Sequence, residues 1–205
     1  MEAATLRRIL CYGDSNTFGY NPHSYWGGPY PDDVRWTGIL RANGWDVINC
    51  GQNGREIPSG EGELSAVERL LSTAMPVDIV TVLLGSNDFL THPHFTAEDV
   101  TARMELLLKH ILAANWELRV LLIAPPPLRN GEWVPDSRIV TESVRLAPLY
   151  RTLADNLGVS FADAGAWDIA LDFDGVHFRP EGHAAFARHL LKSLETLPEP
   201  HVRIP

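Results

Sequence analysis

The sequence has few of the residues that crosslink small folds. Its 205 residues include only two cysteines, Cys11 and Cys50, and both lie in short apolar runs. Two cysteines cannot build a disulfide framework or a zinc knuckle, which excludes both classes of small domain. No run approaches the ~18 apolar residues of a membrane helix, and no signal-peptide pattern follows Arg7 and Arg8. We therefore expect a cytoplasmic protein that makes no contact with a membrane.

Basic residues are also scarce. The 17 lysines and arginines are outnumbered by 26 aspartates and glutamates, so the formal net charge is −9. A phosphate backbone would meet net repulsion over most of such a surface, and we expect no nucleic-acid partner. The hydrophobic fraction of 45% and the charged fraction of 21% are those of an ordinary globular protein. The chain length predicts one domain, spanning residues 1–205.

Short apolar segments alternate with segments of helical periodicity. The expected strands are 8–12, 46–50, 78–84, 119–124 and 159–163, and the expected helices are 36–42, 65–73, 97–114, 142–157 and 180–194. The run 79–84 has no polar face, as in strands buried on both sides. The pattern predicts an α/β fold with a central, mostly parallel five-stranded sheet between two layers of helices.

Two stretches rich in glycine, proline and aromatic residues interrupt this alternation. Residues 19–34 and 125–137 are expected to form long loops after the first and fourth strands. Loops at the carboxyl ends of parallel strands line the ligand crevice, so both are candidate pocket walls, with ordinary surface insertions as the alternative. The proline-containing tail 197–205 cannot continue the last helix and is expected on the surface or against a neighbouring subunit.

A serine and a histidine lie where a nucleophile and its base could meet. Ser15 follows the first expected strand, where α/β sheets bind ligands, although a helix N-cap would look similar. Asp174 and His177 precede the last helix and can supply the carboxylate and base that a serine nucleophile needs. The alternatives are a structural histidine, or a metal site that also uses Asp172 and His183.

Glycine and asparagine follow the second and third strands. Residues 49–54 read NCGQNG and residues 85–88 read GSND. Backbone N–H groups and an asparagine amide at these places can donate to a developing oxyanion, and ordinary turn chemistry is the alternative. Four strand-end loops that each carry one part of an acyl-transfer site predict a serine hydrolase.

The segments 13–15, 49–54, 85–88 and 174–177 resemble, in order and spacing, the four blocks of the SGNH hydrolases, also called the GDSL esterase/lipase family. The resemblance implies a flavodoxin-like three-layer sandwich and a serine esterase that needs no metal or organic cofactor. It also implies that Ser15 is the nucleophile and that Asp174 and His177 complete the triad. The Ser15 N–H, the Gly54 N–H and the Asn87 side chain would form the oxyanion hole.

A narrower likeness concerns residues 9–19, 33–38 and 125–128, which are similar to small bacterial arylesterases that also act as acyltransferases. It implies short-chain acyl or aryl esters as substrates, water or an alcohol as acceptor, and a homo-oligomer. Asn16 stands where the family name leads one to expect leucine, and is expected at the pocket floor or as a helix cap. Phe18 and Tyr30 are further pocket candidates, and Trp36 either lines the pocket or packs beneath the sheet.

Other substrates and one other class of function stay open at this point. Acetylated sugars are an alternative because Trp26, Tyr30 and Trp133 can stack on sugar rings, and thioesters and lysophospholipids are also candidates. In a non-catalytic alternative, residues 13–17 would form an anion- or flavin-binding turn. We expect Asp14 to accept hydrogen bonds from loop amides rather than to take part in the reaction.

Overall fold

The sheet has five strands, all parallel. The computed structural model describes residues 7–114 and 118–198, and its strands are paired in the order β2-β1-β3-β4-β5. The strands are β1 (Arg7–Gly13), β2 (Trp45–Gly51), β3 (Ile79–Leu83), β4 (Arg119–Ala124) and β5 (Ser160–Asp163). This arrangement confirms the predicted central parallel sheet.

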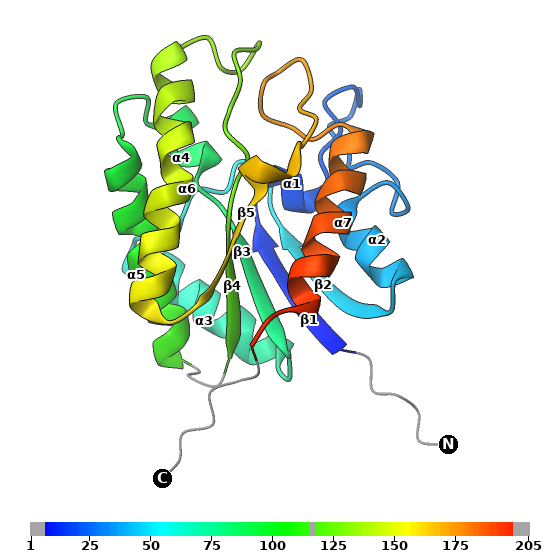
Figure 1. Cartoon of the computed structure of the whole chain (residues 1–205), viewed down its shortest axis with the longest axis vertical. Helices are drawn as coiled ribbons and strands as arrows, with labels where there is room; N and C mark the ends of the chain where they lie inside the picture. Colours follow the sequence, from blue (N-terminus) through cyan, green and yellow to red (C-terminus); the bar gives the residue numbers. More distant parts are fainter. Residues whose placement is uncertain (1–6, 115–117, 199–205) are drawn as a thin grey trace.

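Helices cover both faces of the sheet. They are α1 (Ser15–Phe18), α2 (Trp36–Ala42), α3 (Glu61–Ala74), α4 (Ser86–Thr91), α5 (Ala97–Ala114), α6 (Ser137–Leu157), the 3-10 helix η1 (Ala164–Trp167) and α7 (Pro180–Glu195). Figure 1 shows α2 and α7 on one face and α3, α5 and α6 on the other. The predicted three-layer α/β/α sandwich is thus confirmed.

Two helices begin earlier than the sequence predicted. Helix α6 starts at Ser137 rather than at residue 142, because Asp136 caps it by accepting a hydrogen bond from the Arg138 N–H at 2.8 Å. Helix α3 starts at Glu61 rather than at residue 65, and the Glu63 carboxylate accepts from the N–H groups of Ser59 and Gly60 at 3.0 Å. Of the expected tail 197–205, residues 199–205 lie outside the described residues.

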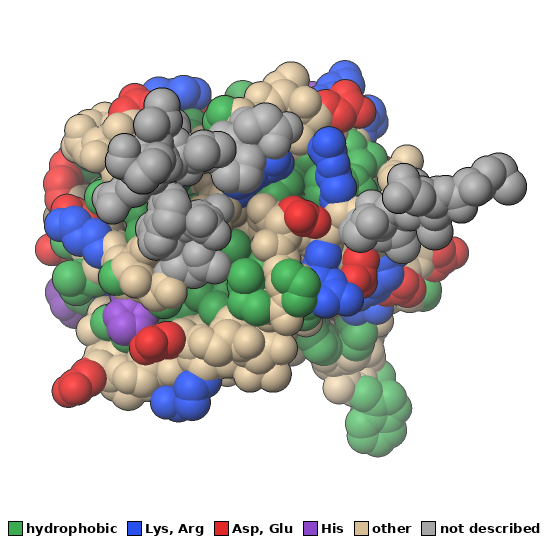
Figure 2. All heavy atoms as spheres, turned by 90° about the horizontal axis from the view of Figure 1, so that it is seen from below, with side chains coloured by type: hydrophobic (Ala, Val, Ile, Leu, Met, Phe, Trp, Pro, Cys, Tyr) green, Lys and Arg blue, Asp and Glu red, His purple; other side chains and the backbone are tan. Residues whose placement is uncertain are grey.

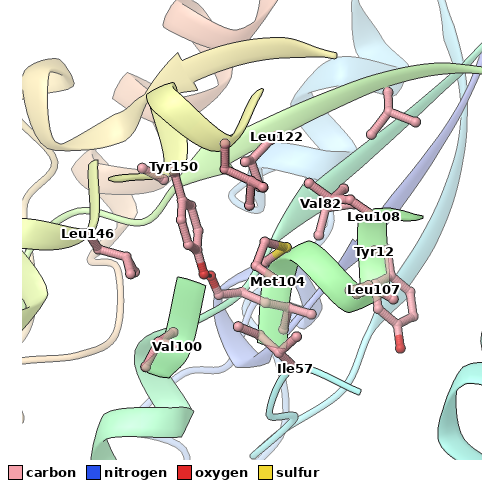
Figure 3. Packing of buried hydrophobic residues seen from close by; sticks show 14 of the residues in the cluster. Tyr12, Ile57, Val82, Val100, Met104, Leu107, Leu108, Leu122, Leu146 and Tyr150 are labelled. Carbon is pink, nitrogen blue, oxygen red and sulfur yellow. Dashed lines mark hydrogen bonds between the residues drawn. The ribbon is translucent and has the colours of Figure 1, made fainter. Parts of the chain in front are cut away.

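The sheet separates two hydrophobic clusters. Figure 3 shows the cluster beneath α5 and α6, whose labelled residues are Tyr12, Ile57, Val82, Val100, Met104, Leu107, Leu108, Leu122, Leu146 and Tyr150. The cluster on the other face includes Trp36 and Phe186. All five residues of β3 are buried, because alternate side chains enter opposite clusters. Within the described residues, no helix is both long and apolar enough to cross a membrane.

The strand order determines where a ligand crevice forms. Strand β2 pairs with β1 at one edge of β1, and β3 pairs with β1 at its other edge. The direction in which successive strands are added to the sheet therefore reverses between β1 and β3. Ligands of such open sheets bind outside the carboxyl ends of the strands at this point. At the opposite end of the strands, acidic and basic side chains are interspersed over the visible surface (Figure 2). The carboxyl ends of β1 and β3 are therefore the place to look for the site.

Candidate active site

A tight turn after β1 presents the Ser15 side chain. Gly13 ends the strand, and a Cβ at this position would lie 2.1 Å from Thr17 Oγ1, so only glycine fits. The Asp14 carboxylate caps the short helix α1 by accepting from the Asn16 N–H at 2.9 Å. Asp14, not Ser15, is thus the N-cap, and it accepts from a loop amide as expected. The Ser15 hydroxyl is left available for another partner.

That partner is His177, which lies 162 positions away in the chain. The Ser15 Oγ is 2.9 Å from His177 Nε2, and His177 Nδ1 is 2.6 Å from Asp174 Oδ2. All three side chains are buried. A carboxylate on Nδ1 holds the proton there, which leaves Nε2 as the acceptor of the serine proton. The structure therefore brings the three predicted triad residues into one hydrogen-bonded chain.

The loop before α7 keeps the Asp174 carboxylate in place. Its Oδ1 accepts from the N–H groups of Val176 and His177, both at 2.9 Å. Burial by itself raises the pKa of Asp174, but the hydrogen bonds from the His177 side chain and from these two amides outweigh burial and lower it below the usual value. Asp174 is therefore ionised at neutral pH and can stabilise a protonated His177.

The predicted oxyanion donors lie in the turn after β1 and in the segments after β2 and β3. Among the described residues, neither the Ser15 N–H nor the Gly54 N–H has a hydrogen-bond acceptor. The Asn87 Nδ2 donates to the Arg55 carbonyl at 3.0 Å, and because an amide NH₂ carries two hydrogens, one is still free. The Arg55 guanidinium in turn donates to the Gly13 carbonyl at 2.8 Å, which ties this loop to the turn before Ser15.

Two aromatic rings from the long loops flank the histidine. The Tyr20 ring centroid is 4.5 Å from that of His177, and the Trp133 centroid is 5.0 Å from it. The two aromatic rings are 6.1 Å apart, and Trp133 is 48% exposed. Each of the loops expected as a pocket wall therefore brings a ring to the triad. Tyr20 was missed as a pocket residue, although it lies within the predicted loop 19–34.

The four predicted pocket residues are buried or half-buried. Trp36 is 1% exposed and packs on Phe186 with centroids 4.9 Å apart, so of its two alternatives the structure places it in the core. Tyr30 is buried with its ring 5.6 Å from His183, and the half-buried Phe18 contributes its carbonyl to Arg35. Asn16 is also buried, and it is not the cap of α1, whose N-cap is Asp14.

The remaining sugar-stacking candidate, Trp26, is 89% exposed and packs edge-on against Tyr25 at 4.9 Å. Of the three rings considered for sugars, only Trp133 contacts the triad histidine. Of the three side chains expected to stack on a sugar ring, Trp133 is therefore the one that lies beside His177, and Tyr20 lies there as well.

The side chains considered for a metal site do not converge. Asp172 pairs with His23 at 3.0 Å, whereas the Nδ1 of His183 accepts from the Trp36 N–H at 3.5 Å. Burial, and then the charges of Arg35 and His177, lower the pKa of His183 to about 3. Over residues 7–114 and 118–198, no three His, Cys, Asp or Glu side chains are grouped to hold a metal ion.

Residues 11–185 match the model of the GDSL-like lipase/acylhydrolase family. The chain belongs to this family. The GDSL-like protein is a carboxylic ester hydrolase, as the family and the esterases among its structural neighbours show. Comparison with curated proteins gives no significant match.

Solved structures of esterases superpose on nearly the whole chain. The M. smegmatis aryl esterase is 28% identical, with a TM-score of 0.82 and coverage of 94% of this chain and 100% of its own. Est24, a carbohydrate acetylesterase from Sinorhizobium meliloti, is 27% identical with a TM-score of 0.81 and the same coverage. A second carbohydrate acetylesterase family member from S. meliloti is 31% identical, with a TM-score of 0.80 and coverage of 92% and 97%. The SGNH hydrolase fold of the GDSL-like protein is thus shown.

Proposed function

We propose that the GDSL-like protein hydrolyses short-chain acyl or aryl esters through an acyl-enzyme on Ser15. The hydrogen-bonded chain Ser15–His177–Asp174, with distances of 2.9 and 2.6 Å, carries this proposal. Such a chain is what activates a serine hydroxyl, which is otherwise a weak nucleophile. The oxyanion donors are the Ser15 N–H, the Gly54 N–H and the Asn87 side-chain amide.

In the acylation half, Ser15 Oγ attacks the ester carbonyl carbon while its proton passes to His177 Nε2. The carbonyl π electrons move onto oxygen, where the three donors stabilise the negative charge, each by about 3 kcal/mol in the transition state. The oxyanion then collapses, and the bond between carbonyl carbon and alkoxy oxygen breaks. The alcohol leaves with the proton that His177 returns to it.

The deacylation half repeats these steps with a new nucleophile. Water loses a proton to His177 as its oxygen attacks the acyl carbon. The bond between the acyl carbon and Ser15 Oγ then breaks, His177 returns the proton to Ser15 Oγ, and the acid is released. An acceptor alcohol that replaces water yields a new ester instead. Nothing else is consumed, because the proton taken in each half-reaction is returned within it.

The positions of the Tyr20 and Trp133 rings indicate on which side of the triad the alcohol part of the ester binds. His177 must reach the departing oxygen, so the alcohol lies beside the imidazole, where Tyr20 and Trp133 approach to 4.5 and 5.0 Å. Flat ring faces stack on aromatic alcohols, which favours aryl esters. Sugar rings have an apolar face as well. Esters of acetylated sugars are therefore the second candidate, in line with the aryl esterase and carbohydrate acetylesterase names of the similar structures.

The proposal is tested by intact mass after incubation with a fluorophosphonate. Wild-type protein is expected to gain one adduct, because only an activated serine displaces fluoride from this reagent at a useful rate. The Ser15→Ala variant is expected to gain none and to lose ester turnover while keeping its circular dichroism spectrum. An unmodified wild-type protein that is shown to be folded would contradict the proposal.

A substrate panel separates the candidates once labelling succeeds. Phenyl acetate, an acetylated xyloside, an acetyl thioester and a lysophospholipid differ in the group that leaves beside His177. The highest kcat/KM is expected for phenyl acetate if the rings serve aryl alcohols, and for the xyloside if they serve sugars. A highest value for the thioester or the lysophospholipid would overturn both of these substrate assignments.

A further inference from the structure

Asn16 is the residue after the proposed nucleophile, and each of its polar groups forms a hydrogen bond. Its backbone N–H donates to Asp14 at 2.9 Å, and its carbonyl accepts from the Trp36 indole at 2.8 Å. Its side-chain Nδ2 donates to the Val176 carbonyl at 3.1 Å, and its Oδ1 accepts from the Phe178 N–H at 2.9 Å. The side chain is buried, so these bonds have little competition from solvent.

The two side-chain contacts fall on either side of the proposed base. Val176 precedes His177 in the chain and Phe178 follows it, so one amide holds the backbone of the base at both of its neighbours. Asn16 itself is covalently attached to Ser15. The same residue therefore fixes the base loop relative to the nucleophile, across a separation of 160 residues or more in the chain.

We propose that Asn16 is a positioning residue that sets the contact between Ser15 and His177. This inference rests on the proposed serine mechanism, because it assigns Asn16 a part in keeping the nucleophile and its base 2.9 Å apart. Trp36 supports the arrangement from the core, because its indole holds the Asn16 carbonyl. The hydrogen bonds of Asn16 go to Asp14, Trp36 and the backbone of Val176 and Phe178, and none goes to Ser15 Oγ or to the His177 ring.

Only an amide side chain satisfies both backbone groups. Asparagine combines one donor for the Val176 carbonyl with one acceptor for the Phe178 N–H on a side chain that reaches both. Leucine, the residue that the family name leads one to expect, has a similar branched shape but no polar atom. A leucine here would leave both buried groups without partners, and the base loop would shift to hydrate them.

The test compares Asn16→Leu and Asn16→Ala with wild type and with the control Asn43→Leu. The alanine variant is included because its smaller side chain leaves room for water at the two backbone groups, should the leucine variant fail to fold. Asn43 also bonds a backbone carbonyl through its side chain, that of Ile39 at 2.8 Å, but it is exposed at the end of α2. Circular dichroism and thermal unfolding establish that each variant is folded.

Steady-state kinetics with phenyl acetate and the rate of fluorophosphonate labelling are the readouts. A displaced base slows both half-reactions but leaves substrate binding intact, so kcat and the labelling rate are expected to fall by about 10- to 100-fold while KM stays within about twofold. Asn43→Leu is expected to match wild type in all three quantities. If Asn16 only stabilised the fold, its variants would unfold at a lower temperature than wild type but would keep the wild-type kcat.

The possible results distinguish this inference from the function on which it rests. A wild type that reacts with the fluorophosphonate, together with folded Asn16 variants that turn over within about twofold of it, overturns the positioning role alone. A wild type that does not react overturns the serine mechanism and the role of Asn16 with it. A loss of kcat at constant KM in either Asn16 variant, absent in Asn43→Leu, supports the inference.

Discussion

At the scale of single residues, the proposed role of Trp133 is to bind the alcohol part of the ester beside His177. Its ring lies 5.0 Å from His177 and is half exposed, so it can stack on a leaving group without being part of the core. Aromatic stacking contributes about 0.5–1.5 kcal/mol beyond buried area, which corresponds to a factor of about 2 to 10 in kcat/KM. Trp133→Ala is therefore expected to lower kcat/KM for phenyl acetate by that factor.

Ethyl acetate is the matched control for this variant, since its leaving group has no ring to stack. Its kcat/KM is expected to change by less than about twofold in Trp133→Ala. An equal loss on both esters, measured in the same assay, would show that the tryptophan orders the loop rather than contacts the alcohol.

The contact between Ser15 and His177 could be predicted from the sequence, but the pocket residues could not. Each triad residue occurs in a short motif next to a strand or helix, and the topology brings those positions to one edge of the sheet. Tyr20 and Trp36 have no such signature. Which of two nearby aromatic residues faces the triad depends on the path of the loop between β1 and α2, and that path is determined by tertiary contacts.

At the scale of secondary structure elements, Arg103 joins α5 to the loop that carries Gly54. Its Nη2 donates to the Ile57 carbonyl at 2.8 Å, and its Nη1 lies 3.1 Å from Glu56 Oε2 and 3.2 Å from Asp88 Oδ1. Asp88, at 0% exposure, also accepts from the Ile57 N–H at 3.1 Å. Arg103 on α5 and Asp88 on α4 thus pair with each other and bind the two polar backbone groups of Ile57, Arg103 the carbonyl and Asp88 the N–H.

Removal of this guanidinium is expected to destabilise the fold. In Arg103→Met the buried Asp88 carboxyl loses its cation, and at about pH 8, where this carboxyl is ionised, breaking a buried pair costs about 3 kcal/mol. Urea unfolding measures the difference. Arg145→Met is the control, because Arg145 bridges Glu98 and Glu142 on the surface and its loss is expected to change stability little. Equal free energies of unfolding for Arg103→Met and Arg145→Met would contradict the stabilising role of Arg103.

The strands and long helices could be predicted closely, whereas the short helices could not. The strands differ from their expected ends by at most one residue, and α2 and α5 have the expected bounds, because their apolar periodicity extends over the whole element. Helices α1 and α4 have only four and six residues, too few for a period to be recognised. Helix α6 continues through Pro148, and its start depends on the cap at Asp136 rather than on apolar residues.

At the scale of the whole molecule, two buried carboxyl groups make stability depend on pH. Burial raises the pKa of Asp14 to about 6 and that of Asp88 to about 7, against an ordinary value of 3.8. Between about pH 4 and pH 7 the folded protein therefore keeps protons that the unfolded chain has released. The contribution of these two groups to the free energy of unfolding therefore falls as the pH rises through this interval, whereas the contribution of the buried His183 rises up to about pH 6.5.

The Asp174 carboxyl limits stability at the acidic end. Its folded pKa is lowered, so the stabilisation it contributes is present above the ordinary carboxyl pKa and is lost as the pH falls through the folded value. The Asp174 effect ends near the ordinary carboxyl pKa and the effect of Asp14 and Asp88 begins there, so these three groups favour a maximum of stability near about pH 4.

The pH dependence can be assigned to Asp88 by removing its charge. In Asp88→Asn the side chain still offers an oxygen to the Ile57 N–H, and Arg103 keeps its contact with Glu56, so the variant is expected to fold. Because asparagine does not titrate, unfolding free energies measured in urea at about pH 5.5 and pH 8 should differ less than in wild type. Asp14 and His183, whose contributions have opposite signs, account for the remaining difference. An unchanged difference would show that the Asp88 carboxyl is already ionised at the lower pH and that its contact with Arg103 outweighs the effect of burial.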